Sequence, residues 1–219
     1  VLIGRCVGER NEQHAAKAVG TLAVLFIILA VILTPVMLLC TDASVAVMAT
    51  PADAVAFTRQ YILICACGIP FIIGYNAVSG IFRGVGDAKT PVYFIMLACI
   101  VNVAGDFLLT GLLGMGAAGA AVATVAAQAI SFLASLLYLS KKGLAFPFSK
   151  KDLRIDGASL RAILKVGIPI ALQDALVNVS FLVITAIINT MGLIASAAVG
   201  VVEKIIVFAM LPPNACASA

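Results

Sequence analysis

The sequence predicts an all-α, polytopic transmembrane protein, and three observations support that prediction. Hydrophobic residues make up 63% of the 219 residues and charged residues 11%, against about 45–50% and about 25% in soluble domains. Six apolar stretches are each about 20 residues or longer, enough to cross a hydrocarbon core of about 30 Å. The basic residues gather in alternate gaps between these stretches. The predicted spans are residues 18–40, 58–82, 91–113, 117–139, 166–190 and 195–219.

The distribution of basic residues predicts the orientation of the spans. Twelve of the 14 Lys and Arg residues lie in residues 1–17, 83–90 and 140–165, which all fall on one side. The gaps on the opposite side contain no basic residue; they are residues 41–57, 114–116 and 191–194. Because basic loops are retained in the cytoplasm, we expect loops 83–90 and 140–165 to be cytoplasmic. The expected location is the cell (inner or plasma) membrane.

The same composition argues against several other classes of protein. The net charge of +4 comes from loops that flank a membrane, so it does not indicate a nucleic-acid partner. His14 is the single histidine and lies in a charged segment, so no catalytic triad can be assembled. Cys65 and Cys67 diverge by roughly 200° on a helix and cannot hold a metal together. No enzyme, catalytic residue or organic cofactor is expected.

The informative residues are the polar ones within the spans. Asp106 lies in the third span, and Asn102 lies one turn earlier on the same helix face. The turn 114–116 joins this span to the fourth one as a tight antiparallel hairpin. Counted outward from Met115, Asp106 is nine residues back and Thr124 nine residues forward, so both should lie about 13 Å below the turn. The small residues that open the fourth span let the two helices approach closely.

These three side chains predict a cation site. A carboxylate, an amide oxygen and a hydroxyl are hard oxygen ligands, suited to Na⁺ or to a proton carried by the carboxylate. An intramembrane carboxylate costs about 2.5–3.5 kcal/mol, which favours a functional role for Asp106. The alternative is that Asp106 is neutralised within the bundle or ties helices together. Asn102 and Thr124 on their own are equally consistent with simple helix bridging.

Other intramembrane polar residues could contribute to a substrate cavity. Asn76 in the second span could face the same site as Asp106. Asp174 and Asn178 form an i, i+4 pair in the fifth span, and Lys204 in the sixth needs a partner or must reach the membrane surface. We treat these last three as possible cavity residues.

Several motifs are similar to those of one transporter family. They are Gly4 through Asn11, Gly68-Ile-Pro70, Asn76 through Phe82-Arg83-Gly84-Val-Gly86-Asp87-Ala-Lys89-Thr90-Pro91, Asn102-Val-Ala-Gly-Asp106, Gly114-Met-Gly116 through Thr124, and Lys165-Val-Gly167-Ile-Pro169. Together they cover essentially the whole chain, and they resemble the multidrug and toxic compound extrusion (MATE) family.

The resemblance implies a fragment of a two-lobe transporter with 6+6 pseudo-symmetry, covering helices three to eight of twelve. Residues 1–139 would belong to the N-terminal lobe, residues 140–165 to the cytoplasmic linker and residues 166–219 to the start of the C-terminal lobe. The flanking helices, including a first helix with an acidic partner for the site, would be missing from this chain. In the DinF-like branch, the matching cation-site positions are Asn76, Asn102, Asp106 and Thr124.

Another branch of the family relies on a Glu in the seventh helix, near where this chain has Val177. That departure favours the site in the N-terminal lobe. The implied function is a cation-coupled (H⁺ or Na⁺) antiporter that exports organic or amphipathic compounds by alternating access. One alternative is a lipid-linked oligosaccharide flippase of the same superfamily, which should have a cationic cavity, for which only Arg59 and Lys204 are candidates. A passive channel or a structural membrane subunit is the alternative from another class.

Overall fold

The computed structural model describes residues 2–47, 55–143, 146–149 and 152–190, together with positions 202, 206, 209 and 210. The chain divides into two compact units, residues 1–163 and 164–219. The described secondary structure is helical, which confirms the predicted fold class. The helices are α1 (Leu2–Gly8), α2 (Glu12–Leu39), α3 (Thr41–Val47), α4 (Val55–Gly84), α5 (Lys89–Asp106) with its continuation η2 (Phe107–Leu112), α6 (Gly116–Lys142) and α7 (Gly157–Thr190).

Five helical stretches within the described residues are long and apolar enough to cross a membrane. They are α2, α4, α5 together with η2, α6, and the part of α7 from Gly157 to Phe181. They coincide with the first five predicted spans. All five begin before the predicted limits, from one residue earlier for α6 to nine residues earlier for α7. The sixth predicted span, 195–219, lies outside the described residues except at four positions.

The structure refines two of the gaps between the predicted spans. The gap 41–57 between the first two predicted spans contains a short helix, α3, in its first part. The segment between the fourth and fifth spans is also shorter than the predicted gap of residues 140–165, since α6 continues to Lys142 and α7 already begins at Gly157. The side chain of Asp156 accepts hydrogen bonds from the amide and the hydroxyl of Ser159, so it caps the first turn of α7. Apolar content alone does not detect such polar helix ends.

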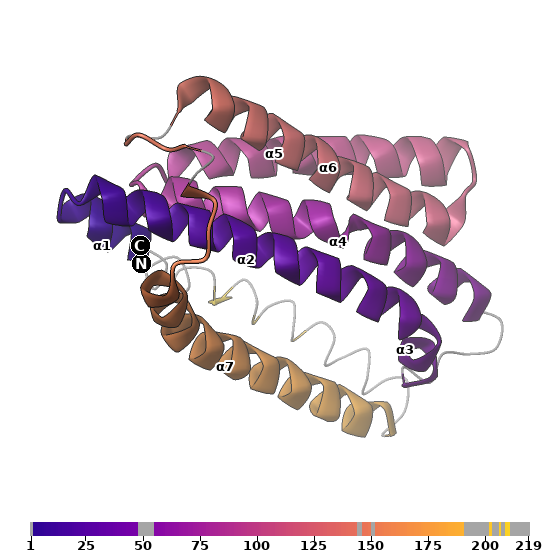
Figure 1. The fold of residues 1–219 in the computed structure, drawn as a ribbon. Helices are drawn as coiled ribbons and strands as arrows, with labels where there is room; N and C mark the ends of the chain where they lie inside the picture. The colour runs from indigo at the N-terminus through magenta and orange to yellow at the C-terminus, as the bar shows by residue number, and fades with distance from the viewer. Residues whose placement is uncertain are drawn as a thin grey trace. The chain divides into compact units, whose positions relative to one another are not determined.

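In residues 1–163, α4 packs against α2 on one side and against α6 on the other, and α6 also packs against α5 (Figure 1). Small residues make these close approaches possible. A Cβ added to Gly68 would stand 2.5 Å from a methyl group of Val125 on α6. The buried face of α6 consists of Ala118, Gly119, Ala121, Ala123, Ala127, Ser131 and Ser135. Packing through small residues is how membrane helices associate without a hydrophobic driving force.

The segment before α7 is fixed to the side of α2. Thr21 is fully buried, and its hydroxyl accepts a hydrogen bond from the amide of Asp156 at 3.0 Å. The backbone of Asp152 lies so close to Gly20 that any Cβ there would collide with it. Gly20 and Thr21 therefore hold the segment from Asp152 to Asp156 against α2.

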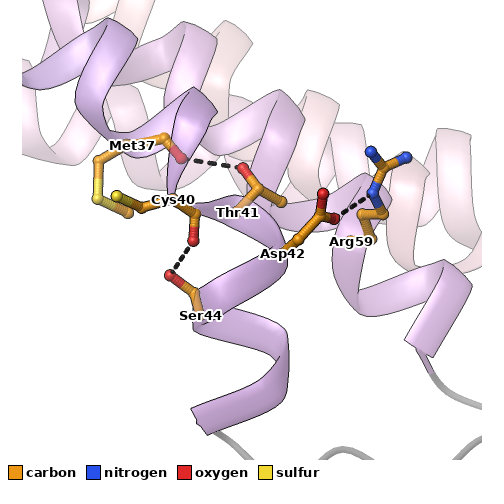
Figure 2. A network of polar contacts seen from close by, with 6 residues as sticks. All are labelled: Met37, Cys40, Thr41, Asp42, Ser44 and Arg59. Carbon is orange, nitrogen blue, oxygen red and sulfur yellow. Dashed lines mark hydrogen bonds and ion pairs between the residues drawn. The ribbon is translucent and has the colours of Figure 1, made fainter.

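At the other end of α2, polar contacts organise α3 (Figure 2). The hydroxyl of Thr41 donates to the backbone carbonyl of Met37 at 2.9 Å, and the hydroxyl of Ser44 donates to the backbone carbonyl of Cys40 at 2.9 Å. The Nε of Arg59 on α4 donates to Oδ1 of Asp42 at 2.7 Å, so this ion pair joins α3 to α4. Both side chains are more than half exposed, 54% for Arg59 and 74% for Asp42.

Candidate cation site

Asp106 is the last residue of α5 and the acidic residue of the predicted site. Its Oδ1 atom is buried and has no hydrogen-bond partner in the described structure. The helix widens into π-helical turns directly afterwards, from Phe107 to Leu112, a local change that often accompanies functional sites. A buried carboxylate oxygen without a donor is costly, so it calls for a proton or a cation.

Asn102 and Thr124 are brought together across the α5–α6 interface. The side-chain amide of Asn102 donates to the hydroxyl of Thr124 at 3.2 Å, and that hydroxyl donates to the carbonyl of Ala120 at 2.9 Å. Gly105 makes this approach possible, because a Cβ there would lie 2.9 Å from the Cβ of Ala123. Two of the predicted ligands are therefore in direct contact, and Asn102 lies one helical turn before Asp106 on α5.

The pairing is one turn deeper than the depth count predicted. The count matched Thr124 with Asp106, whereas the structure pairs Thr124 with Asn102. Residues 107–112 form π-helical turns, which contain more residues per turn and rise less along the axis than an α-helix. Nine residues back from Met115 therefore cover less depth than nine residues forward along α6.

A small cavity of about 170 Å³ opens beside the Asn102–Thr124 pair. Gln128 lines it, one turn beyond Thr124 on the same helix, and the sequence analysis did not single out this residue. Tyr75 of α4 also lines it, with its hydroxyl donating to the carbonyl of Pro91 at 2.9 Å. The i, i+4 spacing of Thr124 and Gln128 was the available signal for this wider polar site.

Asn76 does not contact this site, and Asp174 and Asn178 belong to the second compact unit of the chain. Asn76 is exposed, and its side chain donates to the carbonyl of Ile72 on its own helix at 2.8 Å. Asp174 and Asn178 are exposed on α7, and the Asn178 side chain donates to the carbonyl of Asp174 at 2.8 Å. Lys204 lies outside the described residues.

A second polar cluster fixes the turn between α4 and α5. The carboxylate of Asp87 accepts from the amide of Thr90 at 3.0 Å, from its hydroxyl at 2.7 Å and from Nζ of Lys142 at 2.9 Å. These donors lower the pKa of Asp87 from 3.8 to about 2, the Thr90 hydroxyl contributing most. The Lys142 ammonium also lies 5.3 Å from the centre of the Tyr138 ring. Gly86 adopts a φ of 88°, as a tight turn requires.

Long apolar helices that pack through small residues, one of them with a carboxylate in its apolar section, are those of a polytopic membrane protein. The comparisons with known proteins then specify the family. The MatE family model matches residues 1–108. The probable multidrug resistance protein YoeA of Bacillus subtilis (strain 168) is 30% identical over 219 residues, covering 97% of this chain and 47% of that protein. The multidrug export protein MepA of Staphylococcus haemolyticus (strain JCSC1435) is 26% identical, covering 94% and 46%.

Solved structures agree with these relatives. A multidrug resistance MATE transporter of the MOP superfamily, in its outward-facing conformation, superposes with a TM-score of 0.89 at 26% identity, covering 99% of this chain and 49% of that one. A MOP superfamily transporter from Pyrococcus furiosus Vc1 (DSM3638) gives a TM-score of 0.90 at 25% identity, covering 99% and 48%. The chain belongs to the MATE family of membrane transporters, which are not enzymes. It spans about half the length of the relatives that it matches.

Proposed function

We propose that the protein containing this chain is a cation-coupled antiporter of the DinF-like branch, which exports organic or amphipathic compounds by alternating access. The observation that supports this most directly is the buried, unpartnered Oδ1 of Asp106, one helical turn after the Asn102 that contacts Thr124. The relatives described as multidrug resistance and export proteins support the same substrate class.

The coupling ion, H⁺ or Na⁺, would bind the Asp106 carboxylate. A proton would satisfy the unpartnered oxygen by making it a hydroxyl donor, whereas Na⁺ would take it as a ligand together with the oxygens of Asn102 and Thr124. Coupling requires that ion and drug differ in their affinity for the outward- and inward-facing states. The π-helical turns after Asp106 provide a backbone element that can rewind when the charge of Asp106 is neutralised.

In this proposal, the chain corresponds to helices three to eight of twelve. Residues 1–139 form part of the N-terminal lobe, residues 140–165 the cytoplasmic linker and residues 166–219 the start of the C-terminal lobe. The positive-inside bias supports cytoplasmic loops at 83–90 and 140–165 in the cell membrane. Asn76 would join the site only when the flanking helices of the longer protein cover that face of α4.

The flippase alternative requires a cationic cavity, and its first candidate residue does not support one. Arg59 is engaged in an exposed ion pair with Asp42, so its charge is already compensated. Its second candidate, Lys204, lies outside the described residues. Antiport of small organic compounds is therefore the function that we propose.

The test is transport by the full-length protein in proteoliposomes, with a fluorescent organic cation as substrate and with opposed H⁺ or Na⁺ gradients imposed in turn. We expect one gradient to drive dye movement against its concentration gradient. Dye flux that follows only the dye gradient would indicate a channel and overturn the proposal. Movement of a lipid-linked oligosaccharide analogue without dye transport would favour the flippase.

A further inference from the structure

α2, α4 and α6 enclose an apolar groove of about 1140 Å³ that the proposed ion site does not use. α4 lies between the other two helices and forms the floor from Pro70 to Ile81, while α2 and α6 form the walls. The lining is almost entirely hydrocarbon, with Ile73 on the floor and Phe132 on one wall. This volume slightly exceeds the roughly 300–1,000 Å³ of ordinary small-molecule pockets.

The groove and the polar site use different faces of α4. At 100° per residue, Asn76 lies roughly 130° from the centre of the face formed by the α4 lining residues, which are Pro70, Ile73, Gly74, Ala77, Val78 and Ile81. Tyr75, which lines the small polar cavity, lies about equally far away in the other direction. Neither Asn76 nor Tyr75 therefore lines the groove, and a further helix of the transporter could cover these polar residues without entering it. The apolar side chains that line the groove suit a hydrocarbon chain as the ligand.

The length of the groove suits one acyl chain. From Pro70 to Ile81 the floor on α4 rises roughly 16 Å, and from Val19 to Pro35 the wall on α2 rises roughly 24 Å. One leaflet is about half of the 30 Å hydrocarbon core, so the groove is between one and about one and a half times as long as a leaflet is deep. Phe146 and Leu153, from the segment between α6 and α7, line it at the end where α4 finishes. By the proposed orientation, on which the choice of leaflet rests, this end faces the cytoplasm.

Basic residues flank that end of the groove. Lys141 follows the lining residue Ser140, and Arg154 follows the lining residue Leu153. The nearby carboxylates of Asp152 and Asp156 accept hydrogen bonds from backbone amides. We propose that the groove binds one acyl chain of an anionic phospholipid, whose phosphate is held by Lys141 and Arg154.

The experiment uses the full-length protein with a single tryptophan, in bilayers that contain brominated lipids, which quench tryptophan fluorescence on contact. Phe132→Trp places the probe in the groove. Leu133→Trp is the matched control, since Leu133 is the next residue on α6, at the same depth, and is 51% exposed. We expect Trp at 132 to be quenched more strongly by brominated phosphatidylglycerol than by brominated phosphatidylcholine, by about fivefold or more in relative binding constant. Trp at 133 should show little preference.

Charge variants then test the phosphate contact. Lys141→Gln and Arg154→Gln should each reduce the preference at position 132 by about fivefold. Lys142→Gln removes the same charge from a side chain already paired with Asp87, so it should change the preference less. Ala30→Phe, which fills the groove from α2, should abolish quenching at 132 and leave position 133 unchanged. Equal quenching by both lipids at 132, or no quenching because protein covers the groove, would overturn the proposal.

Discussion

Replacing Gly105 with Ala should disturb the proposed ion site without touching any of its polar groups. A Cβ at position 105 would stand 2.9 Å from the Cβ of Ala123 and 3.3 Å from its Cα. Carbon atoms in favourable contact are about 3.5–4.0 Å apart. Because Ala123 has no flexible side chain that can move aside, α5 and α6 must separate locally by roughly 0.5–1 Å.

That separation determines the expected magnitude. Overpacking of this kind costs about 1–3 kcal/mol. The hydrogen bond from Asn102 to Thr124 is already 3.2 Å long, so the same displacement would stretch it beyond hydrogen-bonding distance. We expect Gly105→Ala to lower thermal stability and to weaken ion-driven efflux, with a larger effect on the ion concentration needed than on drug affinity.

The double variant Gly105→Ala/Ala123→Gly provides the control, because it moves the methyl group to the opposite helix and restores the spacing. The measurements are thermal unfolding of the purified full-length protein and ion-dependent dye efflux. Recovery of both in the double variant is the expected non-additive result for residues in contact. A neutral Gly105→Ala variant, or additive losses in the double variant, would refute the predicted close packing at this site.

Further predictions concern the turn, the topology, the site and the chain itself. Asp87→Ala should lower the free energy of unfolding by about 1–2 kcal/mol, and Asp87→Asn by less, because Asn keeps an acceptor for the Thr90 amide. In the wild type, the stability that Asp87 contributes should be present above about pH 4 and lost as the pH falls through its pKa of about 2. Thermal unfolding measured across that pH range tests both expectations. A single cysteine at position 150, in a background without native cysteines, should resist a membrane-impermeant reagent added to intact cells, while one at Ser44 should react; labelling of position 150 from outside would reverse the orientation. Thr124→Ala should weaken ion coupling less than removal of the Asp106 charge, as judged by dye efflux over a series of ion gradients. The 219-residue chain expressed alone should confer no drug resistance; resistance would contradict the need for the rest of the transporter.

The sequence predicted the five long apolar helices within the described residues because span length follows directly from the thickness of the bilayer. The α5–α6 hairpin was predictable for the same reason, since only three residues separate its apolar runs. α3 was missed because seven residues are too few for a hydropathy signal. The early start of α7 was missed because its first turn depends on a polar cap at Asp156.

The cation site stays a prediction, and the structure bears only on how its residues are arranged: Asn102 contacts Thr124, and one oxygen of Asp106 is buried without a partner. The cost of burying a charge identified Asp106, and helix spacing added Asn102 and Thr124. Which of them pair depended on the π-helical turns after Asp106, and no simple periodicity predicts such turns. Gln128 required knowledge of which face of α6 meets α5. That face is set by tertiary packing of small residues rather than by any local pattern.

The most direct test of the proposed coupling site is Asp106→Asn in the full-length protein, with Asp174→Asn as the matched control at another intramembrane carboxylate. The substitution keeps the side-chain volume and removes the charge, so the protein should insert and fold. Both variants are reconstituted in proteoliposomes, and drug binding and ion-driven efflux are measured on the same preparations. We expect Asp106→Asn to bind drug with little change and to lose ion-driven efflux, while Asp174→Asn keeps most of it. Parental efflux by Asp106→Asn under the same gradient, with loss in Asp174→Asn, would contradict the assignment of ion coupling to Asp106.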